Sequence, residues 1–157
     1  MTYQVSSSGV IPAPPAKVYA VIADYRVHHP RIVPAEYFQK IEVIEGGVGA
    51  GTLTRVTMKV LGKTRELEHA ITEPEPGRVL VEADVDGSST TTFTVDGDKG
   101  ADSSRLTITT ELAGRSGVAG ALERFFGSML LRRIQRKELA QTAAYVAQLD
   151  RSVGKHE

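Results

Sequence analysis

The chain contains four histidines and no cysteine, which excludes thiolate chemistry and makes histidine the side chain to consider for proton transfer. His69 is the strongest candidate, because it alternates with Leu67 and Ile71 and so shares their apolar face of a predicted strand. On that face it could donate to a ligand carbonyl or act as a general base. The alternative is a structural histidine bonded to a neighbouring hydroxyl group. His69 is therefore the predicted catalytic residue, with the structural role left open.

Two further histidines begin an irregular segment at residues 28–34, and two tyrosines flank it. His28 and His29 are adjacent in sequence, so their side chains diverge, and no third ligand follows at a metal-binding spacing. We expect no metal, and we expect His29 with Pro30 to shape a short helix at the mouth of a cavity. Tyr25 and Tyr37 flank this segment and are expected either to present hydroxyls to a ligand or simply to pack.

Charged groups offer weaker hypotheses. Arg65 shares the parity of the apolar strand face and could anchor a ligand carboxylate, although a solvated strand end is the alternative. Arg55 has the opposite parity and is expected to face solvent. Residues 130–137 form a basic amphipathic segment that could touch anionic lipid headgroups, with a plain solvated helix face as the alternative. The sequence has no phosphate-binding loop, dinucleotide fingerprint or nucleophile elbow.

Residue periodicity predicts the elements that position these side chains. A strand at 3–11 ends in a proline-rich segment, and three- and four-residue spacing then predicts a helix over 15–24. Period-two patterns with turn residues between them predict strands at 37–43, 52–61, 64–72, 78–85, 90–95 and 106–112. In the first of these, alternation places Ile41 and Phe38 on opposite faces. The strand at 78–85 is apolar on both parities, so its facing is ambiguous. A long amphipathic helix is predicted over 117–151.

This order of elements predicts an α+β helix-grip fold, in which a seven-stranded curved antiparallel sheet wraps around the long C-terminal helix, with two short helices after the first strand. A twisted sheet wrapped around one helix leaves a cavity where the side chains diverge. The residues expected to line this cavity and bind a ligand are Tyr25, Tyr37, Val56, Met58, Leu67, His69, Ile71, Phe93, Ile108, Phe125 and Met129.

Four segments also carry a family resemblance. They are Ile11–Tyr25, His29-Pro30, Gly49–Thr52 and Ile71–Arg78, in this order and at fitting separations. The chain resembles the SRPBCC (START-like) superfamily, and more narrowly its polyketide cyclase/dehydrase and lipid-transport group. The resemblance covers nearly the whole chain and implies the START-like helix-grip fold with an apolar ligand in an internal cavity, no cofactor being required. It implies little about activity, because the group mixes cyclases, lipid carriers and hormone-binding proteins.

Composition limits the remaining function classes. Lys plus Arg and Asp plus Glu number 19 each, so no net field attracts nucleic acid, and no apolar run reaches membrane-spanning length. We expect a single cytoplasmic domain over residues 1–157, as a monomer or homodimer. The expected function is binding of a small hydrophobic molecule or lipid, and the alternative is a cyclase- or dehydratase-like enzyme with His69 as acid or base. Two or more titratable groups converging on the cavity would favour the enzyme, and the sequence offers one.

Overall fold

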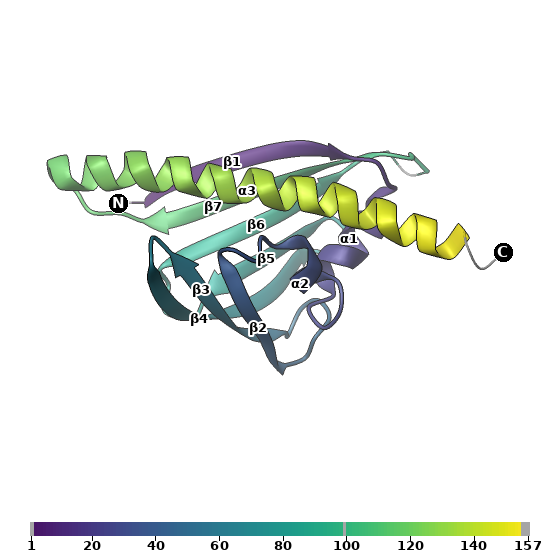
Figure 1. Cartoon of the computed structure of the whole chain (residues 1–157), viewed down its shortest axis with the longest axis horizontal. Coiled ribbons are helices and arrows are strands. Elements are labelled where there is room, and N and C mark those ends of the chain that lie inside the picture. Colours follow the sequence, from purple (N-terminus) through teal and green to yellow (C-terminus); the bar gives the residue numbers. More distant parts are fainter. Residues whose placement is uncertain (1, 99, 155–157) are drawn as a thin grey trace.

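The computed structural model describes residues 2–98 and 100–154, so Met1, Lys99 and residues 155–157 of the expected domain lie outside the description. Figure 1 shows the strands curving beneath one long helix. The elements are β1 (Thr2–Ile11), α1 (Pro15–Ala23), α2 (His29–Ile32), β2 (Phe38–Glu45), β3 (Leu53–Val60), β4 (Lys63–Glu75), β5 (Val79–Asp84), β6 (Ser89–Asp96), β7 (Ser104–Ala113) and α3 (Gly117–Gly154).

The seven strands form one antiparallel sheet in the order β1-β7-β6-β5-β4-β3-β2. The strands from β2 to β7 each pair with the next strand in sequence, as short connections require. The first strand, β1, pairs with β7, so β1 and β2 are the two edge strands of the sheet. The helix α3 lies across the concave face of this sheet (Figure 1). The predicted α+β helix-grip fold, with its two short helices after the first strand, is confirmed.

The short helices are set by local sequence. Pro15 occupies the first turn of α1, where backbone N–H groups have no partner within the helix, so the N–H that proline lacks costs no hydrogen bond. After α1 the Asp24 carboxylate accepts hydrogen bonds from the backbone N–H groups of Arg26 and Val27, which turns the chain into α2. The core then forms where α1 and the C-terminal half of α3 meet the sheet, and it includes Val18, Ile22, Leu80, Phe93, Leu106, Leu139 and Val146. The space beneath the N-terminal half of α3 is left for a cavity.

Two strands differ from simple alternation in ways that matter for the site. A register shift at Gln39 in β2 puts two residues opposite one, so Phe38 and Ile41 both line the concave side, and the predicted opposite facing is wrong. The ambiguous strand is resolved: in β5, Leu80, Glu82 and Asp84 face the interior. The sheet therefore brings two carboxylates to the face that α3 covers.

Candidate functional site

A cavity of about 760 Å³ lies between the concave face of the sheet and α3. Apolar side chains of the strands form much of its wall, and the helix contributes Leu131 and Ile134 from above. A volume of this size is within the range that holds a drug-sized molecule. The apolar residues contributed by the strands are Phe38, Ile41, Val56, Met58, Val60, Leu67, Phe93, Ile108 and Leu112.

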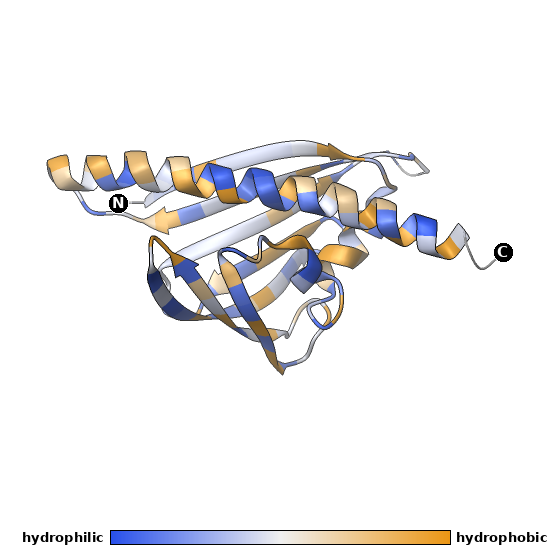
Figure 2. Ribbon diagram, viewed as in Figure 1, coloured by the Kyte–Doolittle hydropathy of each residue, from blue (hydrophilic) through white to orange (hydrophobic). Residues whose placement is uncertain are grey.

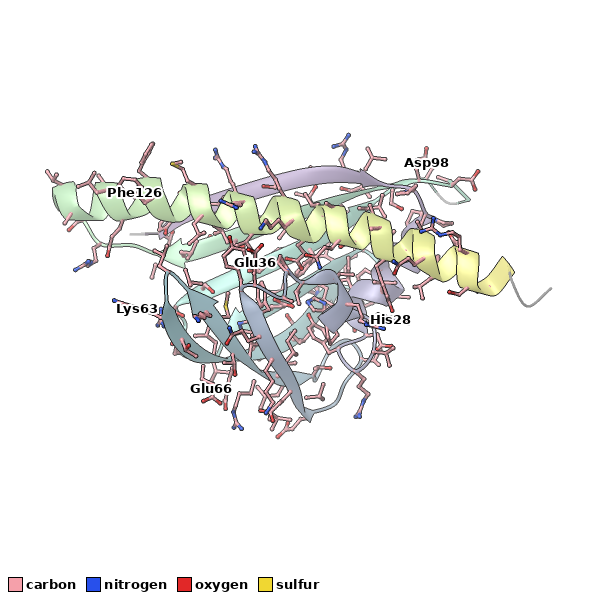
Figure 3. All side chains as sticks on the ribbon, in the orientation of Figure 1. His28, Glu36, Lys63, Glu66, Asp98 and Phe126 are labelled. Carbon is pink, nitrogen blue, oxygen red and sulfur yellow. The ribbon has the colours of Figure 1, made fainter. Side chains whose placement is uncertain are left out.

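The cavity opens between the β3–β4 hairpin and the start of α3. The lining residues there are exposed, whereas those at the other end, such as His29 and Phe93, are buried. The expectation that His29 lies at the mouth is therefore wrong, because α2 packs against α3 at the closed end. The rim is rich in cations, with Lys63 and Arg65 on the hairpin facing Arg115 and Arg124 across the opening; Figure 3 shows Lys63 at the hairpin tip.

Most of the predicted ligand-binding residues line this cavity. They are Tyr25, Val56, Met58, Leu67, His69, Phe93 and Ile108, which come from four strands and the segment after α1 that carries Tyr25. Arg65 also lines it, on the rim. Arg55 faces away from the cavity and forms ion pairs with Glu66 and Glu68 on the convex side of the sheet. Strand parity was sufficient for those of these residues that lie on strands, whereas Tyr25 lies on the segment after α1.

Four predicted lining residues lie elsewhere. Ile71 sits farther along β4 than His69 and is buried in the core beneath α1. Tyr37 precedes the bulge of β2 and lies outside the cavity, with the Lys137 ammonium 5.5 Å from its ring centroid. Phe125 and Met129 project from α3 to solvent at 61% and 58% exposure, because the cavity side of this helix is occupied by Gly127 and Leu131 instead.

His69 bonds to an acidic partner that the sequence alone did not indicate. The register places Thr54, His69 and Asp84 side by side across β3, β4 and β5. His69 Nε2 donates to the Asp84 carboxylate over 2.7 Å, and Ser88 and Ser89 donate to the other oxygen of Asp84 at 2.7 and 2.8 Å. The imidazole is therefore held in a fixed orientation at the cavity wall.

Glu82 connects this pair to a second histidine. Its carboxylate lies 3.9 Å from His69 Nδ1 and 3.3 Å from His29 Nε2, and it accepts a hydrogen bond of 2.6 Å from the Tyr25 hydroxyl. His29 Nδ1 donates to the carbonyl oxygen of Ile22, and its ring stacks on Tyr25 with centroids 4.3 Å apart. Three titratable side chains, Tyr25, His29 and His69, thus lie next to Glu82, and Asp84 is linked to them through His69.

Two polar atoms of the wall have no protein partner among the described residues. They are Glu138 Oε1 on α3 and Thr54 Oγ1 on β3, and both side chains are buried and line the cavity. An unpartnered polar atom in an apolar interior costs about 1–3 kcal/mol. Water or the polar group of a ligand can recover that cost, so these atoms mark where a ligand oxygen or nitrogen would be accommodated.

The pKa values of the clustered side chains shift in different directions, depending on the hydrogen bonds and charges around each group. Burial alone lowers the pKa of His69, but its bond to Asp84 and the charges of Glu82 and Asp84 raise the pKa above the usual value. Burial would raise the pKa of Asp84, and the bonds from His69, Ser88 and Ser89 outweigh it, so this pKa is lowered. Burial lowers the pKa of His29, which the charge of Glu82 only partly opposes.

The pKa of the Glu138 carboxyl group on α3 is raised, whereas that of Asp84 is lowered. Burial, reinforced by the charge of Glu82, raises the pKa of Glu138 well above its usual range, which favours the neutral carboxyl, a hydrogen-bond donor. Burial and the Glu82 charge likewise raise the pKa of Tyr25. The directions of these shifts favour the cationic form of His69, the anionic form of Asp84 and the neutral, hydrogen-bond-donating forms of Glu138 and Tyr25. Such a set can give and take protons on one bound molecule.

Sequence reasoning missed three acids and underused one histidine. Glu82 and Asp84 are the charged residues of an otherwise apolar strand, and their shared parity is a signal, but their proximity to His69 follows only from strand pairing. Glu138 lies four residues from Ile134 and Thr142, so it shares their buried helix face.

Among residues 2–98 and 100–154, no group of three or more His, Asp or Glu is placed to hold a metal ion.

A curved sheet gripping a long helix around an apolar cavity defines a helix-grip protein with a ligand-sized interior. Residues 2–147 match the model of the family described as polyketide cyclase/dehydrase and lipid transport. The chain belongs to this family, as the sequence resemblance implied. A search of curated proteins gives no match. In the part of the chain that the structure describes, no helix is long and apolar enough to cross a membrane.

Solved structures share the fold over almost their whole lengths. The KanY protein (ms6282) is 28% identical with a TM-score of 0.80, and the alignment covers 94% of this chain and 99% of that one. The Zhui aromatase/cyclase from Streptomyces sp. R1128 is 17% identical, with a TM-score of 0.79 and coverage of 98% and 99%. A START superfamily protein from Mycobacterium smegmatis is 14% identical, with a TM-score of 0.73 and coverage of 93% and 98%.

Proposed function

We propose that the protein binds a small, largely apolar molecule with carbonyl or hydroxyl groups and catalyses proton transfer on it, of the kind that cyclisation and dehydration require. The observation that carries this proposal is the contact of His69 with Asp84 at 2.7 Å, next to Glu82, on the wall of an apolar cavity. Membership of a cyclase/dehydrase and lipid-transport family supports it, as does the likeness in fold to a protein named an aromatase/cyclase.

The number of titratable groups in the cavity wall favours a catalytic function over binding alone. The sequence offered His69 alone, which favoured a binding protein, since acid–base chemistry normally needs both an acid and a base. The cavity wall holds His29, Glu82, Asp84 and Glu138 as well. The pKa values of His69 and Glu138 are raised and that of Asp84 is lowered, so donors and acceptors are separated within one site.

A dehydration shows how these groups would act together. The Glu82 carboxylate accepts a proton from the carbon next to a ligand carbonyl, and the Glu138 carboxyl donates a hydrogen bond to the carbonyl oxygen as charge develops there. The His69 imidazolium then gives its proton to the β-hydroxyl. The carbon–oxygen bond breaks, a carbon–carbon double bond forms and water leaves. The apolar wall would hold the rest of the molecule, with burial contributing ~25 cal/mol per Å².

The second candidate function is a carrier that binds such a molecule without changing it. The largely apolar wall formed by the strands favours it, because burial alone supplies affinity and the polar cluster would then serve only to orient the ligand. In this case the unpartnered atoms of Glu138 and Thr54 would bond a ligand oxygen, and His69 would be structural.

Deuterium exchange into a bound ketone separates the two functions. The probe 2-tetralone carries an acidic α-hydrogen on an apolar frame, and its exchange in D2O is followed by NMR, with binding measured in parallel by chemical-shift perturbation. Catalysis predicts faster exchange with the wild-type chain, and loss of that acceleration with Glu82→Gln and His69→Gln while the probe still binds. Glu45→Gln, an exposed glutamate of β2, is the matched control. Binding with no acceleration would establish the carrier function instead.

A further inference from the structure

The outer face of α3 exposes an apolar stripe. Val118, Leu122, Phe125, Phe126 and Met129 are each between 55% and 81% exposed. Their spacing of four, three, one and three residues places them on one side of a helix with 3.6 residues per turn. Figure 3 places Phe126 in the N-terminal part of α3, and Figure 2 shows this end of the helix as largely hydrophobic. Contiguous exposed apolar surface of this kind marks an interaction site.

A cluster of cations continues the same side of the helix. Arg132, Arg133, Arg136 and Lys137 surround a shallow groove that begins at Met129. Lys137 pairs with Glu36, whereas the three arginines form no ion pair with residues 2–98 or 100–154. Between five and six helical turns therefore carry apolar side chains first and arginines next, along one side of α3. We call residues 118–137 of this side the outer face.

The outer face matches the chemistry of an anionic lipid surface. An interfacial helix inserts Phe, Leu and Val between the acyl chains, while neighbouring arginines bind lipid phosphates. A second copy of the chain fits less well, because a two-fold axis would place the arginines of one outer face either against those of its partner, when the helices run parallel, or against its apolar side chains, when they run antiparallel. Neither arrangement gives these cations an acidic partner from the outer face.

Docking through the outer face would bring the cavity close to the membrane. Arg124, Gly127 and Leu131 lie on the opposite side of the same helical segment and line the cavity near its rim. A chain bound through the outer face would therefore hold the cavity opening close to the bilayer, where apolar molecules concentrate. We propose that the outer face of α3 docks on membranes that contain anionic lipids. This inference does not depend on whether the cavity is catalytic.

Vesicle flotation tests the proposal with the full chain. Vesicles of phosphatidylcholine alone, and of phosphatidylcholine mixed with phosphatidylglycerol, are floated with the wild-type protein at low and high salt. We expect binding to the anionic vesicles that weakens with salt. Arg132→Glu with Arg136→Glu should reduce the bound fraction at least about tenfold, since each basic residue contributes roughly fivefold. Phe125→Ser with Phe126→Ser should reduce binding even at low salt.

The matched control is Lys59→Glu with Arg105→Glu, which changes the net charge equally on exposed strand residues away from the outer face. It should bind as the wild type does. Equal loss with the control, or no preference for anionic vesicles, overturns the proposal. A concentration-dependent dimer in sedimentation, abolished by the Phe125 and Phe126 changes without vesicle binding, also overturns it and makes the outer face an interface between copies. Circular dichroism verifies that every variant folds.

Discussion

Replacing Glu138 by glutamine tests the electrostatics of the cavity directly. The folded state raises the pKa of this carboxyl, so the unfolded chain releases the proton first as the pH rises. Wild-type stability that depends on Glu138 is therefore complete below its ordinary pKa and is lost as the pH rises toward the folded pKa. The loss is about 1.4 kcal/mol for each pH unit in this window, or at most about 3 kcal/mol between pH 5 and pH 7.

The glutamine variant keeps the shape and removes the titration. We expect Glu138→Gln to be similar to or less stable than the wild type at pH 5 and to gain on it steadily by pH 7. Urea unfolding followed by circular dichroism at both pH values gives the difference. The titration of His69 is common to both chains and cancels to first order. Glu45→Gln, on an exposed strand position, should show no such pH-dependent gain. Parallel pH profiles for wild type and Glu138→Gln would refute a neutral buried carboxyl.

Further perturbations test the rest of the site. Asp84→Asn should lower the pKa of His69, read from its imidazole proton shifts in NMR, because the opposing effect of burial remains; an unchanged His69 titration would contradict the pairing. Phe93→Ala should cost about 3–5 kcal/mol in urea unfolding, since Phe93 is 2% exposed. Val56→Phe should weaken uptake of 2-tetralone by filling the cavity while the far-ultraviolet circular dichroism stays native; unimpaired uptake would place the ligand elsewhere.

Strand parity explains why so much of the fold and wall could be predicted. Val56, Leu67 and His69 were placed correctly because a two-residue period fixes the face of a regular strand. Phe38 was misplaced because a bulge changes the period without a sequence signal. Phe125 was misplaced because the start of α3 is apolar on both sides, and only its position relative to the sheet decides which side lines the cavity.

The acidic cluster has no explanation in stability alone. Burying carboxylates costs several kcal/mol per ion, and apolar residues of similar size often leave a fold as stable or more so. Glu82 and Asp84 could be leucine as far as the alternation of β5 is concerned, since Leu80 already occupies the same face. The chain instead holds them beside His69, and Glu138 Oε1 on the cavity wall has no hydrogen-bond partner within residues 2–98 and 100–154. Groups that cost stability and point into a ligand-sized space are best explained by what they do to a ligand.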